Sequence, residues 1–546
     1  MRRSFSRRRL LHATGLATAT AASLAASSAS AADPNASASL GLVEPPEGQL
    51  PFVHGVASGD PIPDSVILWT RVTPTEEALP GSGVGPAVTV EWEVARDEGM
   101  RDVVKRGHAQ ATADHDHTVH VDPHGLEPDT VYFYRFLVDG ASSPIGRTKT
   151  APAANASPDK LTFGVASCAN WESGFFSAYR DIAQRARGGQ LDYMVFLGDY
   201  IYEYRSGAYS GFGPVRLHHP AHEITTLADY RTRYGRYRTD PDLQEAHAAL
   251  PWVVVWDDHE IANDNWAGGA ENHSPATEGS WAARQSAAMR AYFEWMPVRA
   301  TAPSEAGHLY RSLTFGDLVE LTMMDLRTYR DEQVSWNPVA FAQEGRSMLG
   351  SEQYEWLLGK IETSQATWKV LGNSVMFAPL NLISLQENSM TAQVAAALTD
   401  NITSIPINGD QWDGYSAERR ALIDALPTHT LFLTGDIHTE WAHAITTGSR
   451  VVGAEMVCAS VSAPNINEAL NLRQGNTVSQ TAQQLLRAAN PHCHHVDLDS
   501  HGYSFVTITR EEAQMHWLRV EDLLKPGSPV HEAVSMTFKP GVGFVS

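Results

Sequence analysis

Four short apolar stretches of the chain each end in side chains of the kind that bind metal ions. The runs are GVASC, FLGDYIY, VVVWDDHE and LFLTGDIH, and they reach Cys168, Asp199 with Tyr202, Asp258 with His259, and Asp436 with His438. A turn or a helix cap explains any one such ending. Sites in open α/β sheets form beyond the carboxyl ends of strands, so four such endings predict one shared site.

Helix-like and strand-like patterns alternate after residue 160, which favours an α/β or α+β layered domain. FFSAYRDIAQRARGG and SEQYEWLLGKIETS are typical of helices, and WKVLGNSV is typical of a strand. We expect this domain to span residues 160–525, with 526–546 as a C-terminal segment. TAPAANASPDK, a loop-like stretch, marks its start.

Residues 51–150 show a different pattern. SVILWTRV, VTVEWEVA and TVYFYRFLV alternate apolar and polar residues between turn residues, which predicts a small β-sandwich. The run GLEPDTVYFYRF has the pattern of a tyrosine corner in a fibronectin-like or Ig-like sandwich. A spacer or lid without chemistry of its own is the alternative to a functional role.

The amino terminus predicts export. Residues 1–31 carry arginines, then small apolar residues and a cleavage pattern at Ala29-Ser30-Ala31, which is typical of a signal peptide, with a membrane anchor as the alternative. The pairs Arg2-Arg3 and Arg7-Arg8 fit the twin-arginine route. Residues 32–50 are predicted to form a linker. Because the signal peptide is removed on export, we expect a secreted protein without a transmembrane anchor after processing.

Overall charge limits the partners of this chain. The formal net charge is −22, which argues against a nucleic-acid-binding surface. An acidic surface attracts divalent cations, so an anionic substrate needs a local positive centre. We expect a monomer.

The side chains at the ends of the four apolar stretches indicate two kinds of metal ion. Thiolate, phenolate and imidazole suit a transition metal, and carboxylates and amides suit a harder cation. Asp199 has two oxygens and can bridge two ions, and a phenolate from Tyr202 favours a ferric ion. The chain has three cysteines, an odd number for an exported protein, so Cys168 is a candidate ligand rather than half of a disulfide.

Five motifs in order, GVASCAN, LGDYIYEY, WDDHEIANDN, LTGDIHTEW and VDLDSHGY, resemble those of the PhoD-type alkaline phosphatase family. This family lies within the calcineurin-like metallophosphoesterase superfamily and includes phosphodiesterases and phospholipase D-like enzymes. The resemblance covers nearly all of the mature chain. It implies a four-layer α/β/β/α sandwich for the catalytic domain.

The same resemblance implies a role for each matching residue. Asp199 is the bridging metal ligand, and Cys168, Tyr202 and His438 accompany it at a ferric ion. Asp258 replaces the usual Asn of a GNH motif, and Asp436 replaces a histidine. Both residues give the second site carboxylate oxygens, which suit a harder cation. The implied cofactors are therefore Fe3+ with one or more Ca2+ ions.

Three residues around the ligands have two possible roles each. Asn263 is a further calcium ligand or a loop-capping amide, and Arg327, like Arg330, clamps phosphate oxygens or forms a structural salt bridge. His501 is a candidate near the site. Cys493 and the neighbouring histidines His492, His494 and His495 receive no role, and Cys458 is expected to be buried.

We therefore predict a secreted alkaline phosphatase or phosphodiesterase that hydrolyses phosphate esters by attack of a metal-bound hydroxide. His259 would stabilise charge on the phosphoryl group or protonate the leaving alkoxide. A phospholipase D-like enzyme acting on phospholipids or teichoic acid is the alternative, and a non-enzymatic cell-surface binding protein is the second. Preference for a monoester or a diester depends on loops such as 205–222 and 380–412.

Overall fold

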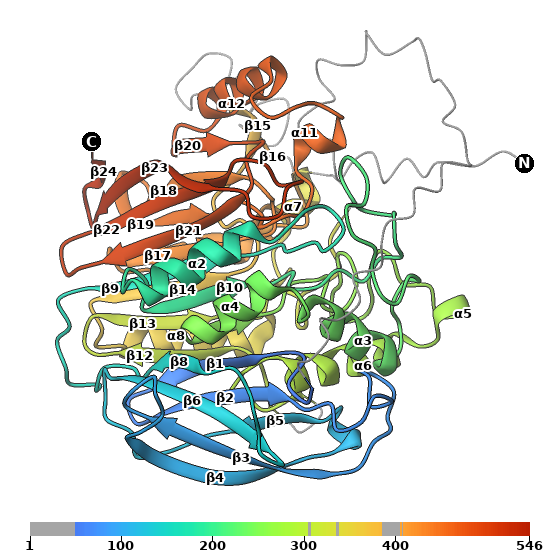
Figure 1. Cartoon of the computed structure of the whole chain (residues 1–546). Coiled ribbons are helices and arrows are strands. Elements are labelled where there is room, and N and C mark those ends of the chain that lie inside the picture. Colours follow the sequence, from blue (N-terminus) through green and yellow to red (C-terminus); the bar gives the residue numbers. More distant parts are fainter. Residues whose placement is uncertain (1–49, 304–306, 335–337, 385–403, 407, 546) are drawn as a thin grey trace, which may run out of the picture.

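The computed structural model describes residues 50–545 except 304–306, 335–337, 385–403 and 407. The predicted signal peptide, and the linker up to residue 49, lie outside the described residues. Most of the described strands belong to two large sheets, which cross the middle of the molecule (Figure 1). No helix in the described part of the chain is long and apolar enough to cross a membrane.

The larger sheet has ten strands in the order β24-β23-β22-β21-β9-β10-β11-β1-β2-β5. Their bounds are β1 (Val56–Ile62), β2 (Ser65–Arg71), β5 (Thr118–Val121), β9 (Leu161–Ala166), β10 (Tyr193–Leu197), β11 (Trp252–Val255), β21 (Gly502–Ile508), β22 (Ala513–Val520), β23 (Val530–Lys539) and β24 (Gly543–Val545). The central strands β9, β10 and β11 are parallel, so their carboxyl ends reach the same edge of the sheet.

The smaller sheet has seven strands in the order β12-β13-β14-β17-β19-β18-β20. Their bounds are β12 (Arg311–Phe315), β13 (Val319–Met323), β14 (Trp368–Asn373), β17 (Thr430–Thr434), β18 (Glu440–Thr447), β19 (Arg450–Val457) and β20 (Cys493–Asp497). Strands β13, β14, β17 and β19 run parallel. A separate pair is formed by β15 (Asn381–Ser384) and β16 (Ser404–Pro406).

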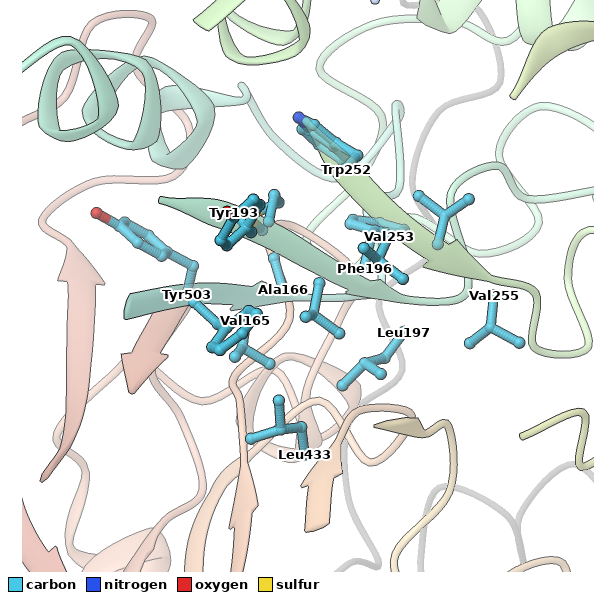
Figure 2. Packing of buried hydrophobic residues seen from close by; sticks show 14 of the residues in the cluster. Val165, Ala166, Tyr193, Phe196, Leu197, Trp252, Val253, Val255, Leu433 and Tyr503 are labelled. Carbon is cyan, nitrogen blue, oxygen red and sulfur yellow. The ribbon is translucent and has the colours of Figure 1, made fainter. Parts of the chain in front are cut away.

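The main hydrophobic core lies between these two sheets. Leu197 of β10 and Leu433 of β17 belong to one buried cluster, and Figure 2 shows Leu433 below the strands that carry Val165 and Leu197. Phe163 and Phe315 meet edge to face across the sheets, with ring centroids 5.3 Å apart. Continuous apolar runs suit such strands because both of their faces are covered.

Helices pack on the outer faces of both sheets. Tyr179 of α2 contacts Trp252 of β11, and the rings of the two side chains lie 5.9 Å apart. On the smaller sheet, Leu357 of α8 and Leu422 of α10 join Phe432 of β17 in a second core. The helices are α2 (Ser177–Arg187), α3 (Leu227–Tyr237), α4 (Pro241–Ala249), α5 (Pro275–Glu278), α6 (Trp281–Trp295), α7 (Pro338–Phe341), α8 (Gly350–Thr363), α10 (Ser416–Ala425), α11 (Ile466–Ala469) and α12 (Thr477–Ala489).

The amino-terminal strands form a third sheet and also extend the first. The third sheet contains β4 (Val103–Ala111), β3 (Val88–Ala95), β6 (Val131–Val138) and β7 (Ala141–Ser142) in that order, and β8 (Gly146–Lys149) pairs with β6. Tyr132 accepts a hydrogen bond from the Glu127 N–H at 2.9 Å, which is the contact expected of a tyrosine corner.

Backbone pairing continues across both expected domain boundaries. β1 lies parallel to β11, with Gly59 opposite Trp252, so the amino-terminal strands β1, β2 and β5 extend the large sheet. A Cβ atom at Gly59 would lie 2.1 Å from the Pro297 carbonyl oxygen, so only glycine permits this close approach. At the other edge, β23 and β24 bring residues 530–545 into the same sheet.

Candidate active site

The predicted ligands gather where the parallel strands end. Cys168 follows β9, Asp199 follows β10, Asp258 follows β11 and Asp436 follows β17. Three of these four residues have a positive φ, namely Cys168 (61°), Asp199 (57°) and Asp436 (65°). A left-handed conformation is uncommon for residues other than glycine and clusters at functional sites, because the surrounding fold must hold it in place.

One group of ligand atoms surrounds Asp199 on the side of β17. Cys168, Asp199 and His438 each offer a ligand atom, and these atoms lie within 4.8 Å of one another. Tyr202 donates a hydrogen bond to Asp199 Oδ2 at 3.0 Å, and its hydroxyl lies 3.2 Å from His438 Nε2. His438 Nδ1 contacts the Pro464 carbonyl at 2.7 Å, so Nδ1 carries the proton and Nε2 can bind a metal.

A second group shares Asp199 with the first. Ligand atoms of Asp199, Asp258 and His259 also lie within 4.8 Å of one another. Asp258 Oδ2 accepts the Asp264 N–H at 2.6 Å, whereas the buried Oδ1 has no hydrogen-bond partner among the described residues. A buried carboxylate oxygen without a partner is costly, and a cation compensates that cost.

Burial and mutual repulsion act on the pKa values of these groups. Burial, together with neighbouring carboxylates, raises the pKa of Asp199 and Asp436 well above the ordinary range. Burial and the nearby Asp199 raise the pKa of Cys168 and Tyr202 in the same direction. A cation among these side chains favours their ionised forms, so the donor set fits a metal centre.

Asp436 and Asn263 lie at the edge of this constellation. Asp436 Oδ1 lies 3.3 Å from an Arg327 nitrogen and belongs to neither of the two groups. Asn263 is half-buried in the loop after β11, and its backbone N–H donates to Glu203 Oε1 at 2.8 Å. Their roles as ligands of the harder cation therefore stay predictions.

His259 has a partner that the sequence did not indicate. Its Nδ1 lies 2.7 Å from Glu203 Oε2, and both side chains are buried. The ring packs against Tyr202 with centroids 4.3 Å apart. Although burial opposes the shift, Asp258, Asp199 and Glu203 raise the pKa of His259 well above its usual range. Glu203 lies in the motif LGDYIYEY, but nothing in its spacing pointed to His259.

Arg327 does not have the free donors that a phosphate clamp requires. Its guanidinium is fully buried and bonds both oxygens of Asp257 at 2.6 and 2.9 Å and both oxygens of Asp410 at 3.0 and 2.9 Å. The remaining N–H lies against Asp436. All five donors are thus directed at protein carboxylates, which favours the structural salt bridge for Arg327; its role in substrate binding stays a prediction.

Arg330 and Glu260 hold the loops around the site. Arg330 bonds Asp410 Oδ1 at 2.7 Å and the Asn265 carbonyl at 2.9 Å, so it also has a structural role. Glu260 accepts the backbone N–H groups of Asp199 at 3.1 Å and of Asp257 at 2.9 Å. One carboxylate thus fastens the end of β10 to the end of β11, and burial raises its pKa to about 7.

Three of the other histidines singled out in the sequence have hydrogen-bond partners, and both remaining cysteines are buried. Cys458 is fully buried, as predicted. His492 Nε2 contacts the Pro379 carbonyl at 2.8 Å, and His495 contacts Glu440 at 3.1 Å. His501 contacts the Ser460 hydroxyl at 2.9 Å.

Comparison with known proteins identifies the family. A family model described as PhoD-like phosphatase matches residues 163–517, and one described as PhoD-like phosphatase, N-terminal domain, matches residues 35–152. The chain belongs to the PhoD-like phosphatase family. It is 37% identical to alkaline phosphatase D of Bacillus subtilis (strain 168) over 516 residues, which cover 90% of this chain and 81% of that protein.

A solved structure agrees with this membership. The structure described as "Structure of PhoD" has a TM-score of 0.79 at 34% sequence identity, and the match covers 92% of this chain and 93% of that one. The mixed α/β architecture is therefore confirmed, and the PhoD-like chain is a phosphoric ester hydrolase.

Proposed function

We propose that this protein is an exported, metal-dependent phosphatase or phosphodiesterase whose chemistry takes place around Asp199. The observation that carries the proposal is the meeting of two groups of ligand atoms on this one carboxylate. The ligand types match the expectation from the sequence, and the unpartnered Asp258 Oδ1 supplies an oxygen for a cation. A binding protein without catalysis has no observation of its own in its favour.

The donor set favours a ferric ion at Cys168, Tyr202 and His438 and a calcium ion at the oxygen ligands. Asp199 would join the two ions, with Asp258, Asp436 and Asn263 on the calcium side. When bound, such ions neutralise phosphoryl oxygens, lower the pKa of water and stabilise charge on the leaving oxygen. They also supply the positive centre that a protein with a net charge of −22 needs for an anionic ester.

His259 is the proposed acid of the reaction. The Nδ1–H group donates to Glu203, which fixes the ring and leaves Nε2 to hold a proton for the phosphoryl group or the leaving alkoxide. The carboxylates around the ring favour the protonated form. Glu203 is a positioning residue, because it acts on the ester only through His259.

The two sheets and their outer helices suit the proposed four-layer α/β/β/α sandwich, and β1, β2 and β5 pack on the third sheet to give the proposed amino-terminal sandwich. In this arrangement the strand ends and the loops that follow them would supply every proposed metal ligand.

The paired arginines before residue 31 support the proposed twin-arginine export. Replacing Arg2, Arg3, Arg7 and Arg8 by lysine should leave the precursor in the cytoplasm, and unchanged export would exclude this route.

Chelation and metal analysis test the proposal directly. Treatment with EGTA should abolish hydrolysis and calcium should restore it, whereas full activity in calcium-free enzyme would exclude the calcium site. Purified protein should contain iron and show a broad visible band that Tyr202→Phe removes. Active protein that contains zinc and no iron would exclude the ferric site.

A substrate panel distinguishes the finer activities. Turnover of p-nitrophenyl phosphate, its bis ester, phosphatidylcholine and teichoic acid should be compared on one enzyme preparation. A marked preference for either of the last two would favour the phospholipase D-like alternative over a general phosphatase.

A further inference from the structure

Two tyrosines beside the candidate active site have no role in the proposed chemistry. Tyr204 and Tyr209 lie on the loop that joins β10 to α3 (Figure 1), and both residues are half-buried. Each ring packs near that of His259, with centroid distances of 5.3 Å for Tyr204 and 6.2 Å for Tyr209. The two tyrosine rings lie 5.5 Å from each other. The proposed acid therefore has two aromatic neighbours that keep part of their surface exposed.

The ring of Tyr209 also reaches the proposed ferric site. It stacks on Tyr202 at a centroid distance of 5.7 Å and lies 6.4 Å from the ring of His438. The Tyr209 hydroxyl is 3.4 Å from His438 Nδ1. Because Tyr202 is 0% exposed and Tyr209 is only half-buried, Tyr209 lies on the solvent side of these ligands. A ring in this position borders the space through which an ester reaches the metal ligands.

Buried polar side chains hold both tyrosines in place. Asn170 Nδ2 donates to the Tyr209 carbonyl at 2.8 Å, and the Arg233 guanidinium donates to the Tyr204 carbonyl at 3.2 Å. Glu172 Oε2 accepts a backbone N–H from the segment between the two tyrosines at 2.7 Å. All three anchoring residues are 0% exposed. The loop is therefore ordered before a substrate binds, which lowers the entropic cost of a contact with the substrate.

The same loop meets the segment that orients His438. A Cβ atom added to Gly211 would lie 3.4 Å from the carboxyl carbon of Glu468 and 3.6 Å from Pro464 Cβ. The Pro464 carbonyl in turn accepts the proton of His438 Nδ1. The loop thus extends from the end of β10 to the opposite side of the ligand cluster, and its two tyrosines line one side of the approach.

We propose that Tyr204 and Tyr209 form an aromatic wall that stacks on the organic group of the phosphate ester and selects esters whose leaving group carries a flat aromatic ring. In the proposed function, on which this assignment rests, His259 faces the leaving oxygen. A group attached to that oxygen lies beside the His259 ring, where the exposed faces of both tyrosines are within reach of it. A flat ring gains more from this contact than a saturated group, because aromatic rings prefer stacked and edge-to-face pairs.

The alternative role of the two rings is structural support for Tyr202 and His259. Loss of a supporting ring would slow the hydrolysis of all esters to the same extent, because every ester uses the same metal ligands and the same acid. Loss of a recognition surface would instead depend on the organic group of the ester. The ratio of kcat/KM for two esters therefore separates recognition from support.

Benzyl, cyclohexylmethyl and methyl phosphate test the proposal on the metal-loaded enzyme, since all three release an unactivated alcohol and differ mainly in the attached group. The wild type should prefer the benzyl ester, mainly through a lower KM. Tyr209→Leu should reduce the preference for benzyl over methyl phosphate by about 2- to 12-fold, whereas Tyr209→Phe, which keeps the ring, should retain it. Leu217→Ala is the matched control: Leu217 lies on the same loop, is 40% exposed and stands outside the aromatic cluster, so this variant should retain the preference.

Metal analysis of each variant accompanies the kinetics. If Tyr209→Leu loses its metals, Tyr204→Leu replaces it, because among the described residues no ring contact joins Tyr204 to Tyr202 or His438. Inhibition by benzylphosphonate and methylphosphonate measures binding without turnover and should show the same preference. An equal loss for all three esters in the leucine variants, or a wild type that hydrolyses methyl phosphate as readily as benzyl phosphate, would overturn the aromatic wall and leave the phosphatase proposal intact. Protein that hydrolyses none of the three esters would contradict the proposed function, and the aromatic wall with it.

Discussion

Replacement of Glu203 by glutamine tests the contact between this carboxylate and His259. Glu203 Oε2 lies 2.7 Å from His259 Nδ1, while Oε1 accepts the Asn263 N–H at 2.8 Å and the Asn272 side-chain N–H at 2.6 Å. Glutamine has the same shape, so its amide oxygen can keep the bonds to Asn263 and Asn272. The amide NH2 group then faces His259 Nδ1 and cannot accept its proton, so the contact loses its acceptor as well as its negative charge.

The size of the effect follows from that contact. A hydrogen bond to a charged group contributes about 1.5–3 kcal/mol, and each 1.36 kcal/mol in a barrier is tenfold in rate. We therefore expect Glu203→Gln to lower kcat by about 10- to 150-fold for esters with poor leaving groups. Since Glu203 helps to raise the His259 pKa, the alkaline limb of the rate profile should move to lower pH.

The assay compares an alkyl phosphate with p-nitrophenyl phosphate across pH, together with the metal content of each protein. The loss should be smaller for p-nitrophenyl phosphate, because its leaving group needs little proton donation. Glu223→Gln is the matched control: Glu223 is paired with Arg284 at 3.0 Å, and no contact joins it to His259 among the described residues. An unchanged kcat and pH profile, or a loss of metal in Glu203→Gln, would refute the reasoning.

Three further variants or conditions test the rest of the site. His259→Ala should keep its metals and lose roughly 10²–10⁴-fold in kcat; wild-type turnover would make it a bystander, and lost metal would make it a ligand. Arg327→Met leaves the buried Asp257 and Asp410 short of positive charge, so denaturant titration should show a loss of about 3–5 kcal/mol; an unchanged midpoint would contradict the ion-pair assignment. Metal affinity should rise with pH, because the raised pKa values of Asp199 and Cys168 mean that metal binding releases protons. Calorimetry in buffers of different ionisation enthalpy measures this proton release. If no protons are released, neither Asp199 nor Cys168 is a ligand.

The sequence alone determined the kind of chemistry and its place in the fold. Apolar runs that end in Asp199, Asp258 and Asp436 predict parallel strands with a shared polar edge, and residue type alone indicates which metals such an edge prefers. These are local properties, since strand period and ligand chemistry depend on a few neighbouring residues. The tyrosine corner at Tyr132 is equally local, and the structure contains the expected hydrogen bond.

Only the tertiary structure decided which charges meet. Arg327 follows a strand, as the proposed metal ligands do. Its partners Asp257 and Asp410, however, are 70 and 83 residues away in the chain. Glu203 reaches His259 across 56 residues, and Arg238 meets side chains of the amino-terminal strands. Such pairings depend on strand order and helix packing, which set the distances between remote segments, and buried charges are stable only where those distances bring a partner.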